Sequence, residues 1–305
     1  MEENYKCKVC GELDYETIVD NIKDWEYGYD GTFSYFQCKN CRLIQIHPFP
    51  DVKDLVNTYK VNYHGFIEPS KKGRLFLYLF NIVEALSLRY FKKELKVDSK
   101  ILDVGCGIGI LLSKLRSMGF SNIEGIDFSK KAYDSLLLKD IKCHFGTFLD
   151  FCGQERSYDL IIMNNYLEHC LAPMEELKKA KLLLKDSGLL IGEMPNFKSL
   201  DRVLFGRYWG GNHVPRHTFQ FDSDKIAALL KNSGFSNIVI KYPLNTSHFS
   251  LSIQNFLQRH KNLQNNNLKY GRAIYYSFLM LMLIPINLLF VLTKRAGFLK
   301  FYARV

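Results

Sequence analysis

The sequence predicts an α/β fold in which helices cover a mainly parallel sheet. Two observations lead to this prediction. From residue 100 onward, short apolar runs alternate with helical patterns, which is the order of elements that builds a parallel sheet. The first of these runs, ILDVGCGIG at residues 101–109, reads as a buried strand that enters a glycine-rich turn. With 305 residues, the chain has room for this domain and a smaller one.

The expected elements of this domain follow in a regular order after the glycine-rich turn. Gly119 and Gly234 stand where two of the helices are expected to stop. The sequence predicts helices at 110–118, 130–139, 174–184 and 223–233, and strands at 122–129, 141–145, 158–163, 188–194 and 237–242.

The smaller N-terminal part carries two C-x2-C pairs. The four cysteines are Cys7, Cys10, Cys38 and Cys41. Each short pair can turn so that two thiolates face one ion, and this spacing suits a tetrahedral zinc site; an iron site and unligated thiols are the alternatives. Short strands are predicted between the pairs, at 17–19 and 32–37, which is a zinc-ribbon pattern. Because four cysteines fill the coordination sphere, we expect the zinc to be structural.

Composition limits the partners and the compartment. Hydrophobic residues make up 47% of the chain, which is enough for a large core. The net charge of +10 favours anionic partners: a membrane surface, a nucleic acid or a phosphorylated substrate. Residues 1–11 are polar and charged, unlike a signal peptide, so a cytoplasmic protein with reduced thiols is expected.

The glycine-rich turn favours a cationic ligand over a dinucleotide. Its glycines are Gly105, Gly107 and Gly109, so the third comes one residue earlier than in the dinucleotide pattern G-x-G-x-x-G. The acid Asp103 precedes them and would repel a pyrophosphate. S-adenosylmethionine (SAM) carries an ammonium and a sulfonium, which a carboxylate attracts. Asp127 follows Gly105 by about 20 residues, the spacing that places a carboxylate beside a bound ribose.

These motifs resemble those of the class I SAM-dependent methyltransferases. LDVGCGIG is similar to the family's first motif, GIDFS to its second, and YDLIIMNNYLEH at 158–169 to its fourth. The resemblance covers residues 98–242, and it implies a Rossmann-like sheet of seven strands. It also implies the following SAM-binding residues: Asp103, Gly105, Cys106, Gly107, Gly109, Asp127 at the ribose hydroxyls, Phe128 at the adenine, Thr147, Phe148 and Asn164.

In this family the last strand is antiparallel and lies between strands five and six. Residues 297–305 alternate as a strand does and fit this place. The uncharged apolar stretch at 273–293 must therefore leave and return on one side of a membrane. Pro285 interrupts it, so we expect two short helices, at 274–284 and 286–293. We expect this hairpin to contact the cytoplasmic membrane surface as a monotopic anchor; a homodimer interface, an active-site cap and a true span are the alternatives.

The sequence thus predicts five segments. They are a zinc-ribbon module at 1–60, a helical linker at 61–97, a SAM-binding core at 98–242, an apolar helical insertion at 243–296 and the final strand at 297–305.

Within the core, the loop at 205–221 follows the fifth strand and should lie over the ligand crevice, so we call it the acceptor loop. His217 is its first candidate for a general base, and His213 is the second. A resemblance to ubiquinone-pathway and small-RNA 2′-O-methyltransferases suggests another role. In those families a Glu-x-x-Glu-His motif holds a divalent metal, and here Glu168, His169 and His217 could do so, although Asn165 replaces the first glutamate.

The acceptor is predicted from the combination of segments. Residues 164–167 read Asn-Asn-Tyr-Leu, which departs from the loop of nucleobase amino-methyltransferases. The cysteine module, the core and the apolar insertion together resemble methyltransferases of bacterial surface-polysaccharide and nucleotide-sugar pathways. This resemblance implies O-methylation of a sugar or lipid-linked saccharide. A prenylated quinone precursor is the alternative acceptor. An RNA-binding methyltransferase, disfavoured because the basic residues are scattered, and a noncatalytic membrane adaptor are alternatives of another class.

Overall fold

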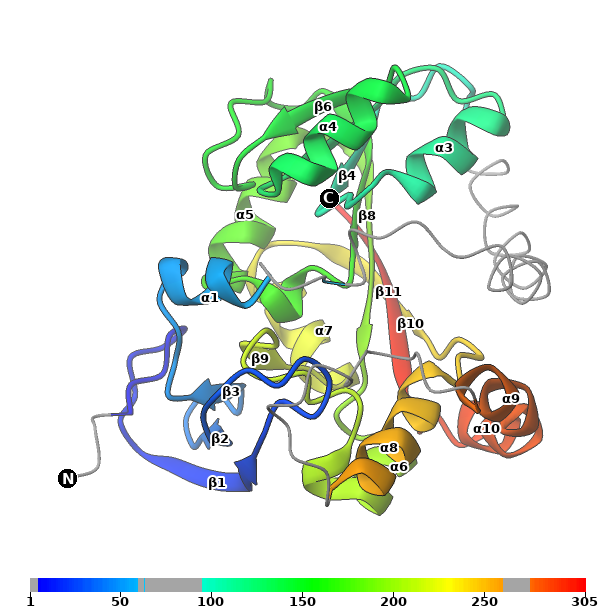
Figure 1. Ribbon diagram of the computed structural model, residues 1–305. Helices are drawn as coiled ribbons and strands as arrows, with labels where there is room; N and C mark the ends of the chain where they lie inside the picture. Colours follow the sequence, from blue (N-terminus) through cyan, green and yellow to red (C-terminus); the bar gives the residue numbers. More distant parts are fainter. Residues whose placement is uncertain (1–4, 60–62, 64–94, 260–274) are drawn as a thin grey trace.

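The computed structural model describes residues 5–59, 63, 95–259 and 275–305 (Figure 1). Its centre is a seven-stranded sheet with the strand order β10-β11-β8-β7-β4-β5-β6. The strands are β4 (Ile101–Val104), β5 (Ile123–Asp127), β6 (Lys142–Phe145), β7 (Tyr158–Asn164), β8 (Leu184–Pro195), β10 (Ser236–Lys241) and β11 (Phe298–Arg304). Only β11 runs antiparallel to its neighbours, β8 and β10, among these strands. The predicted fold class and the place of the last strand are confirmed.

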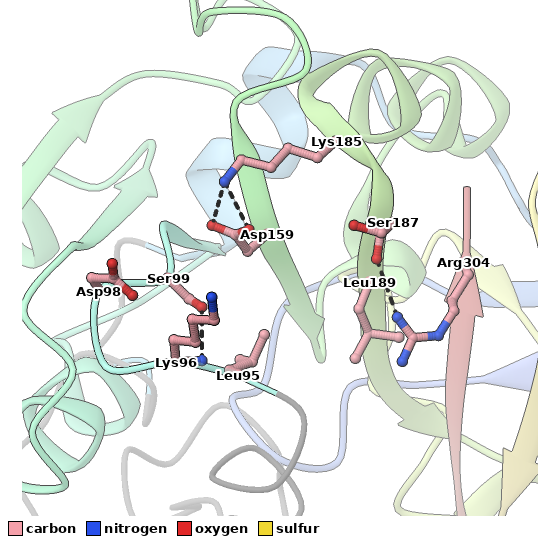
Figure 2. A pocket seen from close by; sticks show the side chains of 9 residues that line it. All are labelled: Leu95, Lys96, Asp98, Ser99, Asp159, Lys185, Ser187, Leu189 and Arg304. Carbon is pink, nitrogen blue, oxygen red and sulfur yellow. Dashed lines mark hydrogen bonds and ion pairs between the residues drawn. The ribbon is translucent and has the colours of Figure 1, made fainter.

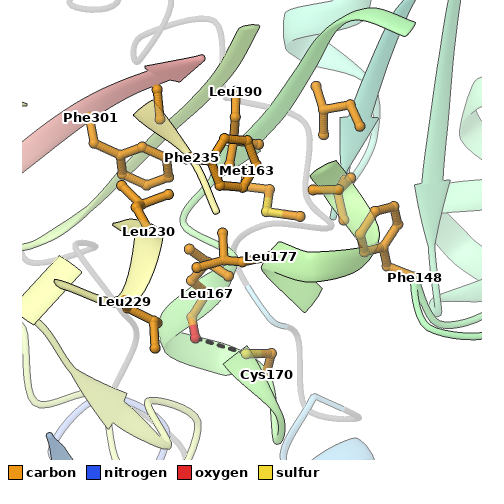
Figure 3. Packing of buried hydrophobic residues seen from close by; sticks show 14 of the residues in the cluster. Phe148, Met163, Leu167, Cys170, Leu177, Leu190, Leu229, Leu230, Phe235 and Phe301 are labelled. Atoms are coloured by element: carbon orange, nitrogen blue, oxygen red, sulfur yellow. Dashed lines mark hydrogen bonds between the residues drawn. The ribbon is translucent and has the colours of Figure 1, made fainter. Parts of the chain in front are cut away.

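Alternation along the central strands divides the core between the two faces of the sheet. Leu102 and Val104 of β4 point to the same face of the sheet and pack against α5 (Pro173–Leu183) and α7 (Ser223–Asn232). Figure 3 shows part of this cluster. Ile101 faces the other way, toward α3 (Ile110–Ser117) and α4 (Lys130–Leu138). Because both faces are covered, the strands read as continuous apolar runs. All four helices lie where the sequence predicts them.

The N-terminal module, residues 5–59, is a second sheet that includes part of the acceptor loop. Its strands are β1 (Tyr15–Ile22), β2 (Phe33–Cys38) and β3 (Ile44–His47), followed by α1 (Val52–Thr58). A fourth strand, β9 (Phe219–Gln220), comes from the acceptor loop and pairs with β3. Two of these strands were predicted, but β3 and α1 were not. The pairing of β9 with β3 ties the module directly to the core.

The apolar insertion packs beside the edge of the large sheet that carries β10 and β11 (Figure 1). It contains α8 (Ser247–Gln258), α9 (Tyr276–Met282) and α10 (Ile284–Leu292); α8 also contacts α6 (Leu200–Phe205). Pro285 lies in the first turn of α10, where its missing N–H costs no helical bond. The predicted break is therefore present, two residues earlier than expected. Among the described residues, no helix has both the length and the apolarity needed to cross a membrane.

The predicted helical linker at 61–97 lies outside the described residues except for residues 63 and 95–97.

Candidate active site

A cavity of about 840 Å³ opens at the carboxyl ends of β4, β5 and β7. This is the edge of an α/β sheet where ligands bind. Nine of the ten predicted SAM-binding residues line it: Asp103, Gly105, Cys106, Gly107, Asp127, Phe128, Thr147, Phe148 and Asn164. His169, His213 and His217 line the same cavity. The predicted cofactor site and the predicted acceptor site are therefore one continuous space.

The glycine-rich turn places its backbone close to this space. Gly105 has a φ of 71°, and a Cβ added there would lie 2.8 Å from Cδ2 of Tyr166. Gly107 donates its N–H to Oδ2 of Asp127 over 3.0 Å, which joins the ends of β4 and β5. Gly109 does not line the cavity, and a Cβ on it would lie 2.8 Å from Cδ1 of Leu136. Its contacts are with α4, so its predicted role in SAM binding stays a prediction.

Two buried carboxyl groups give this end of the cavity a preference for a cation. Burial raises the pKa of Asp103 to about 8, and the charge of Asp127 adds to the shift. Burial also raises the pKa of Asp127 to about 6, although the N–H groups of Ser129 and Gly107 oppose the shift. A ligand that carries positive charge would restore the ionised forms. The ammonium and sulfonium of SAM fit this requirement, and a pyrophosphate does not.

The remaining predicted SAM-binding side chains lie around the carboxyl groups. Phe128 is partly exposed and meets the edge of the Tyr59 ring at a centroid distance of 5.3 Å. Asn164 has a buried Oδ1 with no hydrogen-bond partner among the described residues, so it is available to a ligand. Phe148 is buried, whereas Thr147 is exposed and donates to Asp150. Each side chain has a geometry compatible with its predicted role, which stays a prediction.

Three histidines form a cluster at the other end of the cavity. The ring centroids of His169 and His217 are 4.6 Å apart, and those of His213 and His217 are 4.9 Å apart. Nδ1 of His217 lies 2.8 Å from the carbonyl oxygen of Gly211, which can only accept, so Nδ1 carries the proton. Burial lowers the pKa of His217 and lowers that of His169 to about 3. Both rings are therefore neutral at physiological pH, as a proton acceptor must be.

The structure also brings together the three residues of the predicted second metal site. One ligand atom each from Glu168, His169 and His217 lies within 4.8 Å of the others. Neither carboxyl oxygen of Glu168 has a hydrogen-bond partner among the described residues, although the side chain is 1% exposed. One carboxylate and two imidazoles form a donor set that suits a divalent cation. A general base and a metal site are both compatible with this cluster.

The N-terminal module supplies buried acids that the sequence analysis missed. Glu26 makes a hydrogen-bonded pair with Nδ1 of His213, and both side chains are buried. Asp24 accepts from Nη2 of Arg216 over 2.9 Å, in a pair that is 1% exposed on each side. Tyr35 donates its hydroxyl to the backbone of the acceptor loop. These partners are separated by about 180 residues, so no local pattern could pair them; the only signal was a run of acids among aromatics, DWEYGYD.

The four cysteines converge as the sequence predicted. The Sγ atoms of Cys7 and Cys41 are 3.5 Å apart, and so are those of Cys10 and Cys38. All four lie within 4.8 Å of one another. Tetrahedral zinc with Zn–S bonds of about 2.3 Å requires sulfur separations of about 3.8 Å. The cluster therefore has the donor chemistry and the size for zinc.

A second cavity, of about 320 Å³, lies at the opposite edge of the sheet (Figure 2). Three of its charged side chains have partners: Lys185 contacts both carboxyl oxygens of Asp159 at 2.8 Å, and Arg304 donates to the carbonyl oxygen of Ser187. Because it lies at the amino ends of β4 and β7, it takes no part in the site described above.

Comparison with known proteins identifies the family. A family model described as a methyltransferase domain matches residues 74–240, which is more than half of the chain. The chain therefore belongs to this methyltransferase family, and its class is that of the class I SAM-dependent methyltransferases.

The curated relatives share the core but not the full chain. A ribosomal protein L11 methyltransferase of Dictyoglomus thermophilum is 27% identical over 160 residues, which are 51% of this chain and 48% of that protein. A ubiquinone biosynthesis O-methyltransferase of Actinobacillus pleuropneumoniae is 29% identical over 177 residues, 52% of this chain and 74% of the relative. The chain thus spans about half the length of the first relative and three quarters of the second.

Solved structures agree on the fold. A SAM-dependent methyltransferase from Archaeoglobus fulgidus matches with a TM-score of 0.51 and 16% identity, over 74% of this chain and 94% of that one. Phosphoethanolamine N-methyltransferase 2 of Haemonchus contortus, solved with phosphomonomethylethanolamine and S-adenosylhomocysteine, matches with a TM-score of 0.52 and 14% identity, over 90% of this chain and 69% of that one. At these identities the likeness shows the fold alone.

Proposed function

We propose that this protein methylates a hydroxyl group of a sugar or of a lipid-linked saccharide, with SAM as the methyl donor and zinc as a structural ion in the N-terminal module. The observation that supports the proposal best is the continuity of the cavity. It runs from the turn with Asp103 and Asp127 to the cluster of His169, His213 and His217. O-methylation requires a cationic donor at one end and a neutral imidazole at the other, and burial lowers the pKa of both His169 and His217.

Each end of the cavity has its own task. When bound, SAM supplies a methyl group on a sulfonium. Asp103 and Asp127 would hold the positively charged donor, and Asn164 would accept from it. The acceptor hydroxyl must lose its proton as the new C–O bond forms, and an imidazole of the acceptor loop can take it. Fixing both reactants in one cavity lowers the entropic part of the barrier, which is a large share of catalysis in methyl transfer.

Two arrangements of the histidine cluster can accept this proton. In the first, Glu26 holds His213 and the Gly211 carbonyl holds His217, so that each ring presents a fixed edge to the acceptor. In the second, a divalent cation on Glu168, His169 and His217 lowers the pKa of the hydroxyl. The donor set fits the cation, but the first arrangement needs nothing beyond the chain itself, and we favour it.

A prenylated quinone precursor is the second candidate acceptor. Its support is the similarity to ubiquinone biosynthesis O-methyltransferases, which reaches 29% identity over the core. Apolar residues also line the cavity where α1 approaches it, at Val52, Leu55 and Val56. A phenol of this kind would use the same imidazoles.

The test is transfer of a labelled methyl group from SAM by the intact protein to three acceptor classes: nucleotide-sugars, lipid-linked saccharides and polyprenyl phenols. We expect label on a saccharide oxygen, located by mass spectrometry. His217→Gln and His213→Gln should each lower kcat by about 10²-fold or more, with SAM affinity unchanged. Stimulation of the wild type by added divalent cation, lost in Glu168→Gln, would favour the metal arrangement. Label only on the phenol would favour the quinone candidate, and label on none of the three classes would refute both acceptor proposals.

A further inference from the structure

The helices α9 and α10 expose several large apolar side chains. Their most exposed apolar side chains are Phe278, Met282, Leu288, Leu289 and Leu292, of which Leu292 is 78% exposed. We call this set the docking surface. The inner side of α10 is packed, because Phe290 stacks on Phe249 of α8 at a centroid distance of 5.7 Å. The hairpin is thus anchored to the fold on one side and apolar on the other. Apolar patches of this kind mark interaction sites.

The sequence stretch that contains the docking surface carries charge of one sign. From Lys225 to Val305 the sequence contains eleven Lys and Arg residues and no Asp or Glu. The net charge of the whole chain is +10, so this C-terminal part accounts for the basic balance. Lys294 and Arg295 follow α10 directly and are exposed. An apolar surface bordered by cations, with no anion in the same stretch, is complementary to anionic lipid headgroups above acyl chains.

The docking surface is also linked to the cavity. Thr246 donates its hydroxyl to the carbonyl oxygen of Met280 in α9 over 2.8 Å, and Tyr276 donates to the carbonyl oxygen of Ser247. Ser247 lines the cavity, together with Asn245 and His248 at the start of α8. The hairpin that carries the docking surface is therefore hydrogen-bonded to residues at the wall of the cavity.

We propose that the docking surface binds a bilayer that contains anionic lipid, as a monotopic contact. α9 and α10 have 7 and 9 residues, well short of the roughly 20 that span a bilayer. A second copy of this chain fits less well. A two-fold dimer would place the basic stretches of both copies at one interface, without an acid in either stretch to pair with them. The inference that the acceptor is itself membrane-bound rests on the function proposed above, whereas the docking does not.

The experiment is flotation of the full-length protein on phosphatidylcholine vesicles with and without phosphatidylglycerol, at low and high salt. The test variant is Leu288→Ser, Leu289→Ser, Leu292→Ser. The matched control is Leu137→Ser, Leu138→Ser, which removes exposed apolar side chains from α4. SAM binding by calorimetry shows that every variant is folded. We expect the wild type and the control to float with phosphatidylglycerol, and salt to weaken this without abolishing it. The test variant should bind at least about tenfold less, since burying one leucine contributes a factor of about this size.

Three outcomes would overturn the proposal. The wild type could fail to float, or the test variant could float as well as the wild type. The wild type could also be a dimer in sedimentation that the test variant is not, which would make the surface an interface between copies. Flotation is measured without methyl transfer, so failure of docking and failure of the proposed acceptor chemistry are told apart: a protein that methylates soluble sugars and does not float refutes only the docking.

Discussion

The N-terminal module and the apolar insertion differ in the side chains that they bury and expose. The module forms buried polar pairs with the core, Glu26 with His213 and Asp24 with Arg216. The insertion packs apolar side chains on the core, as between Phe249 and Phe205, whose ring centroids are 5.8 Å apart. The module directs its polar groups inward, toward the cavity, whereas the insertion leaves its apolar groups outside. Burying charge is costly, and a core of hydrophobic residues would often be as stable. The module's polar contacts therefore point to a role in the site, and the insertion's exposed surface points to a role outside it.

Removing the proposed zinc should have the largest effect, because the loss would act on the whole module. In small cysteine modules the binding free energy of zinc is largely folding free energy. We expect Cys10→Ser, Cys41→Ser to lose bound zinc, to expose residues 5–59 to protease and to lower methyl transfer by at least about 10²-fold. SAM binding should persist, since Asp103 and Asp127 belong to β4 and β5. Elemental analysis, limited proteolysis and calorimetry measure these effects. Cys152→Ser, an exposed cysteine outside the cluster, is the control. Full activity in the zinc-free variant would show that the N-terminal module has no role in the active site.

The next largest effect on stability is expected when one partner of a buried ion pair is removed. Asp24→Ala leaves the Arg216 guanidinium buried without its carboxylate, which costs about 3–5 kcal/mol of folding free energy. Asp20→Ala is the matched control, because Asp20 and Arg207 also join β1 to the acceptor loop but are largely exposed. That change should cost less than about 1 kcal/mol. Urea unfolding measures both. Equal losses would show that burial of the pair is not what holds the module.

Glu26→Gln tests whether Glu26 orients His213 for catalysis or mainly stabilises the folded protein. The amide has the shape of the carboxyl group and is easier to bury, so we expect the urea midpoint to stay within the error of the wild type. If Glu26 orients His213 for proton transfer, kcat should fall by about 10²-fold while the KM of the acceptor changes little. Glu16→Gln, on the exposed side of β1 in the same module, is the control. An unchanged kcat would leave His217 as the working base.

The pH dependence of SAM binding tests the other end of the cavity. Burial raises the pKa of Asp103 to about 8 and that of Asp127 to about 6, so in the free protein Asp103 ionises only as the pH approaches 8. A cationic ligand pairs with the ionised forms, so affinity should rise from pH 6 to pH 8, by up to about tenfold per pH unit. Asp103→Asn should bind SAM more weakly and with a flatter profile. Calorimetry across this range decides it; a flat wild-type profile would contradict the prediction.

The sequence predicted the core and the convergence of the cysteines because their signals are local. The alternation of strands and helices, the glycine-rich turn and the two C-x2-C pairs each lie within a few residues of chain. β3 and α1 were missed, although residues 44–47 and 52–58 carry apolar positions. The contribution of Glu26 and Asp24 could not be predicted, since each partner lies about 190 residues away and only the folded chain brings them together. α8 was also missed, although Phe249, Ile253 and Phe256 recur at helical spacing. It also buries polar side chains such as Gln254 and Asn255.

The smallest change in folding free energy is expected for exposed side chains of the insertion. Leu289→Ser, Leu292→Ser removes exposed side chains, so the folding free energy should change by no more than about 0.5 kcal/mol per substitution. Phe290, the residue between them, is 7% exposed, and Phe290→Ala should cost about 3–5 kcal/mol. Urea unfolding in the absence of lipid measures both. If the serine variant were as destabilised as Phe290→Ala, the exposed face of α10 would be needed for folding. If the serine variant is as stable as the wild type, the fold does not need these exposed apolar side chains. Binding to a partner would then explain why they are apolar.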